Sequence, residues 1–159
     1  MQKLLLHRSG EFYPVQVVRL QPRDLEQMKK KDGWTRGFNW GVYFQASNVE
    51  MYKLLAGNDQ IQGVIAMEAA EGFVEVHLVE SAPHNRGVNR EFSQVGAHLF
   101  AFACRRSIEL GNEGFVVFTA KTKLIEHYRS ILGAKPISSD GRMVIDDVAA
   151  NRLISVYLR

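Results

Sequence analysis

The stretch that decides the fold runs from Gly72 to Ala120 and reads "GFVEVHLVESAPHNRGVNREFSQVGAHLFAFACRRSIELGNEGFVVFTA". It begins with a strand pattern at Gly72–Glu80 and ends with a nearly unbroken apolar run at Gly114–Ala120, which is typical of a strand buried on both faces. A long connection and then a long helical pattern separate the two. A strand, a crossover helix and a second strand make a unit in which the two strands are parallel.

The residues before this unit predict an antiparallel meander. Two further strand patterns precede Gly72 and are separated by the short breaks "GNDQ" and "AEG", which are typical of hairpins; they cover Val49–Ala56 and Ile61–Ala69. A first strand is expected at Pro14–Leu20 and a helix at Pro22–Lys31, with Lys29–Lys31 in its last turn and Gly33 after its end. The aromatic segment that follows Gly33 is expected to be irregular or to form a second short helix.

The residues after the unit predict two more helices and two short strands. A helix over 121–132 should stop at Gly133, and short strands are expected at 135–137 and 143–145. The last segment is expected to be an amphipathic helix whose apolar side carries Val148, Leu153, Ile154 and Tyr157. The order of elements indicates an α/β protein with a mixed central sheet of about six to seven strands, flanked by four to five helices.

Composition is that of an ordinary soluble globular protein. The 159 residues suit one domain over 1–159, with 46% hydrophobic and 23% charged residues. No apolar run approaches the roughly 20 residues that span a bilayer, and three leucines near the start are too few for a signal peptide. The lone Cys104 cannot form an internal disulfide, so the reducing cytoplasm is the expected compartment. A net charge of +3 favours an anionic ligand but makes nucleic acid an unlikely partner.

The start of the crossover helix has two interpretations. No Asp, Glu, Lys or Arg occurs from Phe92 to Cys104, so this helix should be buried on most sides. Its first turn carries the small residues Gly96 and Ala97, and a helix N-terminus with exposed amides binds phosphates well. Alternatively, Gly96 only permits close packing of the helix on a strand. The nearby cations could reach a phosphate, and each is also typical of a surface charge; they are Arg86, Arg90, Lys121 and Lys123.

The segment "VGAHLFAFACRRSIELG", followed by "NEGFVVFTAKTKLIEHYRSILGAK", resembles the pyrophosphate loop, helix, strand and tyrosine-bearing helix of the GNAT N-acetyltransferase superfamily. The order of elements agrees over most of the chain. Two departures are visible: Glu91 stands where the family's loop has Arg or Gln, and Gln94 stands at its first glycine. Tyr128 is also one residue further from Gly133 than in the common family spacing.

The resemblance implies acetyl-CoA as cofactor and an amine as acceptor. The CoA pyrophosphate would be held by backbone amides of the helix start, those of Ser93, Gln94, Val95, Gly96 and Ala97. Leu78 and Val79 would pair with the pantetheine arm, and the Val79 amide would polarise the thioester carbonyl. Tyr128 would protonate the leaving thiolate. The partners expected are therefore acetyl-CoA and an amine-bearing small molecule or protein, and a homodimer is left open.

Other side chains offer a general base. Glu75 and His77 should share one face of their strand, opposite Val74, Val76 and Leu78. Glu75 is the first choice for deprotonating the amine through water, and Glu80 at the strand end is a further one. These strand residues are each also typical of a strand face exposed to solvent. Tyr128 is likewise typical of a residue that packs its helix against the sheet.

Two hypotheses about function follow. The first is an acetyl-CoA-dependent N-acetyltransferase in which the amine attacks the thioester directly. The second, motivated by the altered loop, is a GNAT-like module that senses CoA or binds protein or RNA without turnover. No metal site is expected, because the histidines show no ligand spacing, and Cys104 among apolar residues is interpreted as core.

Overall fold

The structure is a computed structural model that describes residues 4–57 and 59–158. Its strands form one mixed sheet in the order β1-β2-β3-β4-β5-β6-β8-β7. They are β1 (Leu4–Leu6), β2 (Phe12–Arg19), β3 (Val49–Ala56), β4 (Gln60–Ala70), β5 (Phe73–Ser81), β6 (Val116–Thr119), β7 (Lys135–Pro136) and β8 (Arg142–Ile145). All neighbours are antiparallel except β5 and β6, which are parallel, so the predicted meander and crossover are confirmed.

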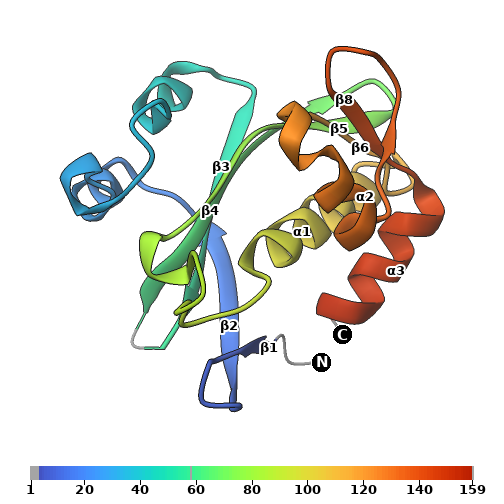
Figure 1. Cartoon of the computed structure of the whole chain (residues 1–159). Helices are drawn as coiled ribbons and strands as arrows, with labels where there is room; N and C mark the ends of the chain where they lie inside the picture. Colours follow the sequence, from blue (N-terminus) through green and yellow to red (C-terminus); the bar gives the residue numbers. More distant parts are fainter. Residues whose placement is uncertain (1–3, 58, 159) are drawn as a thin grey trace.

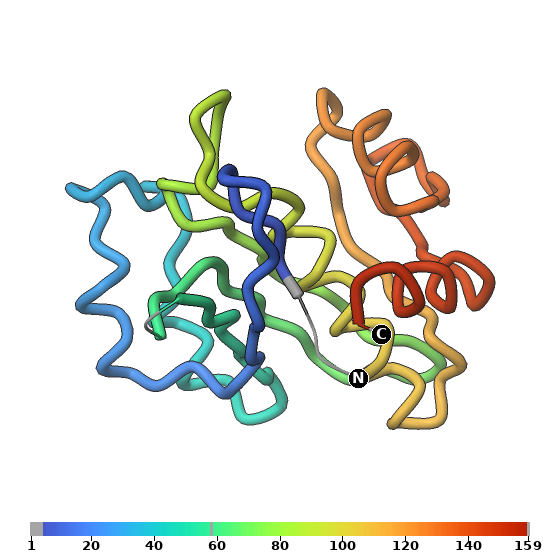
Figure 2. Tube along the Cα trace, turned by 90° about the horizontal axis from the view of Figure 1, so that it is seen from below, coloured from blue at the N-terminus to red at the C-terminus, as the bar shows by residue number. Residues whose placement is uncertain are grey.

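Two layers cover the two faces of the sheet (Figure 1). One is made of α-helices, which are α1 (Val95–Glu109), α2 (Ile125–Leu132) and α3 (Asp147–Tyr157). The other is made of short 3-10 turns on the far side, which are η1 (Pro22–Gln27), η2 (Lys30–Asp32) and η3 (Trp40–Gln45). Figure 2 shows the same separation from below, with the blue and cyan turns on one side and the orange and red helices on the other.

Each layer has its own core. The larger core lies under the α-helices, where residues of α1 and α3 such as Leu99, Phe100 and Leu153 are buried against Ile65 and Val116 of the sheet. The smaller core lies under the 3-10 turns; its members include Leu20, Met28, Trp34, Trp40, Met51 and Val64. In the described residues, no helix is both long enough and apolar enough to cross a bilayer.

The prediction of a helix at Pro22–Lys31 is wrong, because the segment forms the separate 3-10 turns η1 and η2. Asp24 is tied to β3, because its carboxylate accepts two hydrogen bonds of 2.9 Å from Lys53. Met28 enters the smaller core, but Lys29 to Lys31 are all exposed. No apolar face continues past Met28 to be buried, so nothing offsets the unfavourable nucleation of a longer helix.

Two smaller expectations also need correction. Strand β1 was not predicted, because three residues are too few to show an alternating pattern. In α3, Leu153 and Ile154 are buried as expected, but the Val148 side chain is 74% exposed. The helix is capped by Asp146, whose side chain accepts a hydrogen bond from the Ala149 amide, and this start turns Val148 away from the sheet. The sheet has eight strands, against the six to seven expected.

Candidate functional site

The parallel strands β5 and β6 separate after a short contact. They pair only at Val74 with Val116, Glu75 with Val117 and Val76 with Phe118. Strand β5 then continues to Ser81 beside β4 without a partner on the β6 side. The gap is lined by side chains from both strands and from α1 and α2, so the sheet opens between β5 and β6.

A β-bulge shifts the phase of β5 at His77. Residues Val76 and Leu78 lie opposite the adjacent Met67 and Ala66, so His77 is an additional residue in the strand. The expectation that Leu78 shares a face with Val74 and Val76 is therefore wrong. Leu78 packs in the smaller core under the 3-10 turns, and Val79 takes its place in the core under the α-helices.

The bulge also directs the amide of Val79 into the gap. The Ala82 amide donates to the Gln62 carbonyl at 2.9 Å, which makes these two residues a hydrogen-bonded pair of β4 and β5. Such pairs alternate along an antiparallel ladder, so Ile65 and Val79 form a pair without hydrogen bonds and the Val79 N–H points away from β4. The Ser81 carbonyl also faces away from β4 and accepts hydrogen bonds from Arg86.

The first turn of α1 opens onto the same region. Gln94 precedes the helix in the left-handed conformation, with a φ of 63°, and turns the chain sharply into α1. Among the described residues, no hydrogen bond is made by the amides of Val95, Gly96 or Ala97. The Ser93 amide differs, because it donates to the Leu6 carbonyl at 3.0 Å, so it is not available for a ligand as expected.

The structure decides between the two interpretations of Gly96. A Cβ atom placed on Gly96 would meet nothing within 4 Å, so close packing does not require glycine there. A glycine that the packing of α1 does require is Gly63 on β4, where a Cβ would lie 2.6 Å from Val95 Cγ1 and 3.0 Å from Leu99 Cδ1. Gly96 therefore leaves open space in front of the free amides of α1.

Two adjoining cavities occupy this region. The first, of about 250 Å³, is lined by the α1 start with Arg90, Asn85 and His127. The second, of about 420 Å³, is lined by the β5–β6 gap with Phe38, His77, Lys121 and Lys123. Both include Val79, Phe100 and Tyr128 in their linings, so the two cavities meet at these residues.

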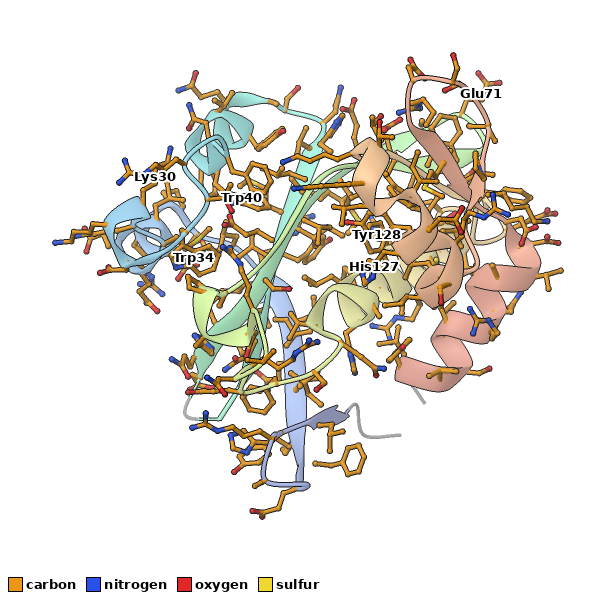
Figure 3. The ribbon with its side chains drawn as sticks, in the orientation of Figure 1. Lys30, Trp34, Trp40, Glu71, His127 and Tyr128 are labelled. Carbon is orange, nitrogen blue, oxygen red and sulfur yellow. The ribbon has the colours of Figure 1, made fainter. Side chains whose placement is uncertain are left out.

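Tyr128 lies at the junction of the cavities. Its ring packs edge-on against Phe100 and Phe118, with centroid distances of 5.8 and 5.1 Å. Burial raises the pKa of its phenol, so the hydroxyl stays protonated at neutral pH. Within the described part of the chain, that hydroxyl has no hydrogen-bond partner. Figure 3 shows Tyr128 and His127 on α2, on the helical side of the sheet.

The expected base Glu75 does not reach either cavity. Arg142 of β8 donates two hydrogen bonds, of 2.6 and 2.8 Å, to its two carboxylate oxygens. Glu80 is also occupied, because its buried carboxylate accepts hydrogen bonds from the Thr35 amide, the Trp40 indole and Arg86. Among the described residues, neither carboxylate belongs to the lining of these two cavities, and the hydrogen bonds of both contribute to holding the fold together.

His77 does line the second cavity. Its Nε2 lies 2.8 Å from Glu68 Oε1, and its ring stacks on Tyr43 at a centroid distance of 6.0 Å. If Nε2 carries the hydrogen that Glu68 accepts, the lone pair is on Nδ1. A histidine held this way can accept a proton, which is the chemistry expected of Glu75.

Sequence reasoning missed several lining residues. Phe100 and His127 carried a signal, since one lies a helical turn after Gly96 and the other precedes Tyr128. No signal in the sequence indicated Asn85. Its side chain holds the connection between β5 and α1 in place, because it accepts a hydrogen bond from the Phe92 amide and donates to Gln62. Of the four cations considered for a phosphate, Arg90 alone lines the first cavity.

Cys104 is fully buried, and burial raises the pKa of its thiol to about 12, which excludes a nucleophilic role at neutral pH.

Three solved structures share this architecture. Spermidine N-acetyltransferase from Vibrio cholerae in complex with CoA and spermine has a TM-score of 0.60 and 11% identity, over 86% of this chain and 98% of that chain. The AtaTR complex bound with acetyl-CoA has a TM-score of 0.60 and 13% identity, over 88% and 98%. An acetyltransferase of the GNAT family from Staphylococcus aureus Mu50 has a TM-score of 0.56 and 11% identity, over 82% and 96%. No protein-family model and no curated protein matches the sequence. The chain therefore has the fold of the GNAT acetyltransferases.

Proposed function

We propose that this protein is an acetyl-CoA-dependent N-acetyltransferase that acylates a primary amine by direct attack on the thioester. One observation carries the proposal: a cavity at the free amides of α1 and a cavity at the gap between β5 and β6 meet at Val79 and Tyr128. When bound, acetyl-CoA supplies an acetyl group already activated as a thioester. The amine is that of a small molecule or a protein, and the buried lone Cys104 fits a reducing cytoplasm.

The first cavity fits the pyrophosphate of acetyl-CoA. The amides of Val95, Gly96 and Ala97 are free donors at the positive end of the α1 dipole, and Gly96 leaves room for phosphate oxygens to approach them. Arg90 adds a positive charge to the lining of this cavity. The free edge of β5 beyond the bulge, at Leu78 and Val79, is the part of the sheet that can pair with the pantetheine arm.

The junction of the cavities carries the groups that acyl transfer needs. The Val79 N–H points into the gap, where it donates to the thioester oxygen as negative charge develops there. Tyr128 donates its proton to the sulfur as the carbon–sulfur bond breaks. His77, oriented by Glu68, accepts the proton that the attacking nitrogen loses as the carbon–nitrogen bond forms. The two side chains then exchange protons with water.

Calorimetric titration with acetyl-CoA tests the proposal, using Gly96→Glu and Gly96→Ala as a matched pair. Wild type should bind, and Gly96→Ala should bind within about threefold, because a methyl group meets no protein atom within 4 Å and fills only part of the space left for the phosphate oxygens. Gly96→Glu places a carboxylate among the phosphates and should weaken binding more than about tenfold, which is about 1.4 kcal/mol. Thermal melts of both variants should match wild type.

Three results would count against parts of the proposal. Absence of binding by wild type at millimolar acetyl-CoA would overturn it. Wild-type affinity in Gly96→Glu would place the phosphates away from α1. Tight binding without acetylation across a broad panel of amines would indicate a CoA-binding module without turnover.

A further inference from the structure

The second cavity has an asymmetric charge. Lys121 and Lys123, which lie between the end of β6 and α2, both line it and both are exposed. Neither forms an ion pair with any residue in the part of the chain that the structure describes. No Asp or Glu is among the residues that line this cavity.

The carboxylates closest along β4 and β5 are not part of this lining. Glu75 is bound by Arg142, and Glu80 is buried and bound by Arg86. Glu68 lies 2.8 Å from His77 Nε2 and keeps its negative charge while His77 is neutral, so it lies at the end of the cavity assigned to the amine. The charged groups in the lining itself are therefore the two lysines, and the remaining lining includes apolar side chains such as Phe38, Leu78 and Leu124.

We propose that the acceptor is an amine with an apolar part and a neighbouring anionic group, a carboxylate or a phosphate, and that Lys121 and Lys123 bind this anion. The inference rests on the proposed function, because it assigns the second cavity to the acceptor. The amine lies toward His77 and Tyr128, and the anion lies toward the lysines. A polyamine brings only positive charge to two unpaired cations and is rejected.

The lysines belong to the acceptor rather than to CoA for a geometric reason. The free amides of α1 and Arg90 line the first cavity, whereas Lys121 and Lys123 line only the second. Between the two groups lie Val79 and Tyr128, which mark the place of the thioester. An anion at the lysines is therefore on the far side of the reacting atoms from the pyrophosphate.

Matched amines test this assignment through the release of CoA thiol. Phenylalanine is compared with phenylalaninamide, which lacks the carboxylate, and O-phosphoethanolamine with ethanolamine, which lacks the phosphate. Rates are compared at equal concentrations of the unprotonated amine. We expect kcat/KM to favour an anionic member by about tenfold or more, as charge-assisted hydrogen bonds allow, and the two pairs distinguish carboxylate from phosphate. Spermidine should not be acetylated.

Replacing either lysine should reduce the preference for the anionic amine, as tested with Lys121→Gln and Lys123→Gln. In the double variant the preference should fall to less than about threefold. Lys30→Gln is the matched control, because Lys30 lies on η2 in the opposite layer (Figure 3) and should change nothing. Acetyl-CoA affinity, measured by calorimetry, should be unchanged in all four variants.

Several outcomes would overturn the inference while leaving the proposed function intact. These are efficient acetylation of spermidine, an unchanged preference in the double variant, and acetylation only of amines without an anion. Loss of acetyl-CoA affinity in the double variant would assign the lysines to the cofactor. If wild type fails to bind acetyl-CoA at all, the proposed function itself fails, and the acceptor assignment falls with it.

Discussion

At the scale of single residues, Tyr128 combines two properties that rarely occur together. It is packed edge-on between Phe100 and Phe118, which holds the ring in one position, yet its hydroxyl has no partner among the described residues. Burial raises the pKa of the phenol above its usual value, so it remains an acid throughout the neutral range. A held, protonated and unpaired hydroxyl at the junction of two cavities is suited to giving a proton to a leaving group.

Replacing Tyr128 by Phe should lower kcat by about a hundredfold or more, because general acid catalysis contributes about 10²–10⁴-fold. Acetyl-CoA affinity should stay within about threefold, since the ring packing is retained. In wild type, the decline of kcat at alkaline pH should begin only above the ordinary phenol pKa of about 10, and the variant should lack that decline. Steady-state rates between pH 6 and 11 measure both effects.

Tyr13→Phe is the control for this substitution, because Tyr13 packs against His7 and Phe92 outside the two cavities. It should have wild-type rates at every pH. An unchanged kcat in Tyr128→Phe would remove Tyr128 from the chemistry and leave it as a packing residue.

At the scale of elements, the site depends on how closely α1 lies on β4. Gly63 allows this approach, because it puts backbone where any other residue would put a Cβ against Val95, Leu99 and the Glu80 carbonyl. Val95 starts the turn whose amides face the first cavity, so the same contact that packs the helix also positions its free end. Gly96 lies one residue further on, where nothing limits the side chain.

Gly63→Ala should therefore destabilise the protein by about 1–3 kcal/mol, the usual effect of overpacking a filled core. Gly96→Ala, the same chemical change on the free face of α1, should leave stability unchanged or slightly raise it, because alanine has the better helix propensity. Urea unfolding followed by circular dichroism measures both. Equal stability of the two variants would show that β4 and α1 are not in this close contact.

At the scale of the whole molecule, one buried carboxylate fixes the 3-10 layer to the sheet. Glu80 on β5 accepts hydrogen bonds of 2.6 Å from the Thr35 amide, 2.8 Å from the Trp40 indole and 2.6 Å from Arg86. The segment that it anchors also carries Phe38, which lines the second cavity. The 3-10 layer is thus fixed to the strand whose far face forms the proposed CoA site.

Glu80→Gln should destabilise the protein by on the order of 3 kcal/mol, because it leaves the charge of Arg86 without its buried partner. Trp34 and Trp40 both lie in the 3-10 layer (Figure 3), so tryptophan emission should shift to the red at a lower urea concentration than the loss of circular dichroism. Glu71→Gln, at the exposed turn between β4 and β5, is the control and should behave as wild type. If tryptophan emission and circular dichroism of Glu80→Gln change at the same urea concentration, and at the same concentration as in wild type, the carboxylate does not hold the 3-10 layer to the sheet.

Much of the fold was predictable because its signals are local. The apolar run at Val116–Thr119 and the strand patterns of β3 to β5, separated by short breaks, indicate strands directly, and a strand, a long helical connection and a second strand indicate a parallel pair. The turns η1 and η2 were mistaken for one helix, since capping signals mark where a helix can begin but not whether its face will be buried. The start of α1 was a candidate because of its small residues and uncharged sequence, and Tyr128 because of a resemblance. The structure places the first turn of α1 on the first cavity and Tyr128 on both.

The partners of the charged side chains were not predictable. Glu75 pairs with Arg142 and Glu80 with Thr35, contacts between residues 67 and 45 positions apart in the chain. Both glutamates were possible bases from their positions on β5. A strand pattern predicts on which face of the sheet a side chain lies, but not which residue contacts it there. The bulge at His77 likewise cannot be recognised in the sequence of β5. It nevertheless determines which backbone amide of β5 faces the gap.

The amino-acid order by itself determined most of the strands and the α-helices, the order in which they follow one another, and that β5 and β6 run parallel, but not β1 or the turns η1 and η2. Those features follow from periodicity and connection length, which are properties of neighbouring residues. Only the tertiary structure decided that, among the described residues, the amides of Val95 to Ala97 have no partner and the lysines after β6 have no counterion, and that Gly63 rather than Gly96 allows α1 to pack on β4. Each of these depends on the side chains that distant segments bring, or fail to bring, into contact.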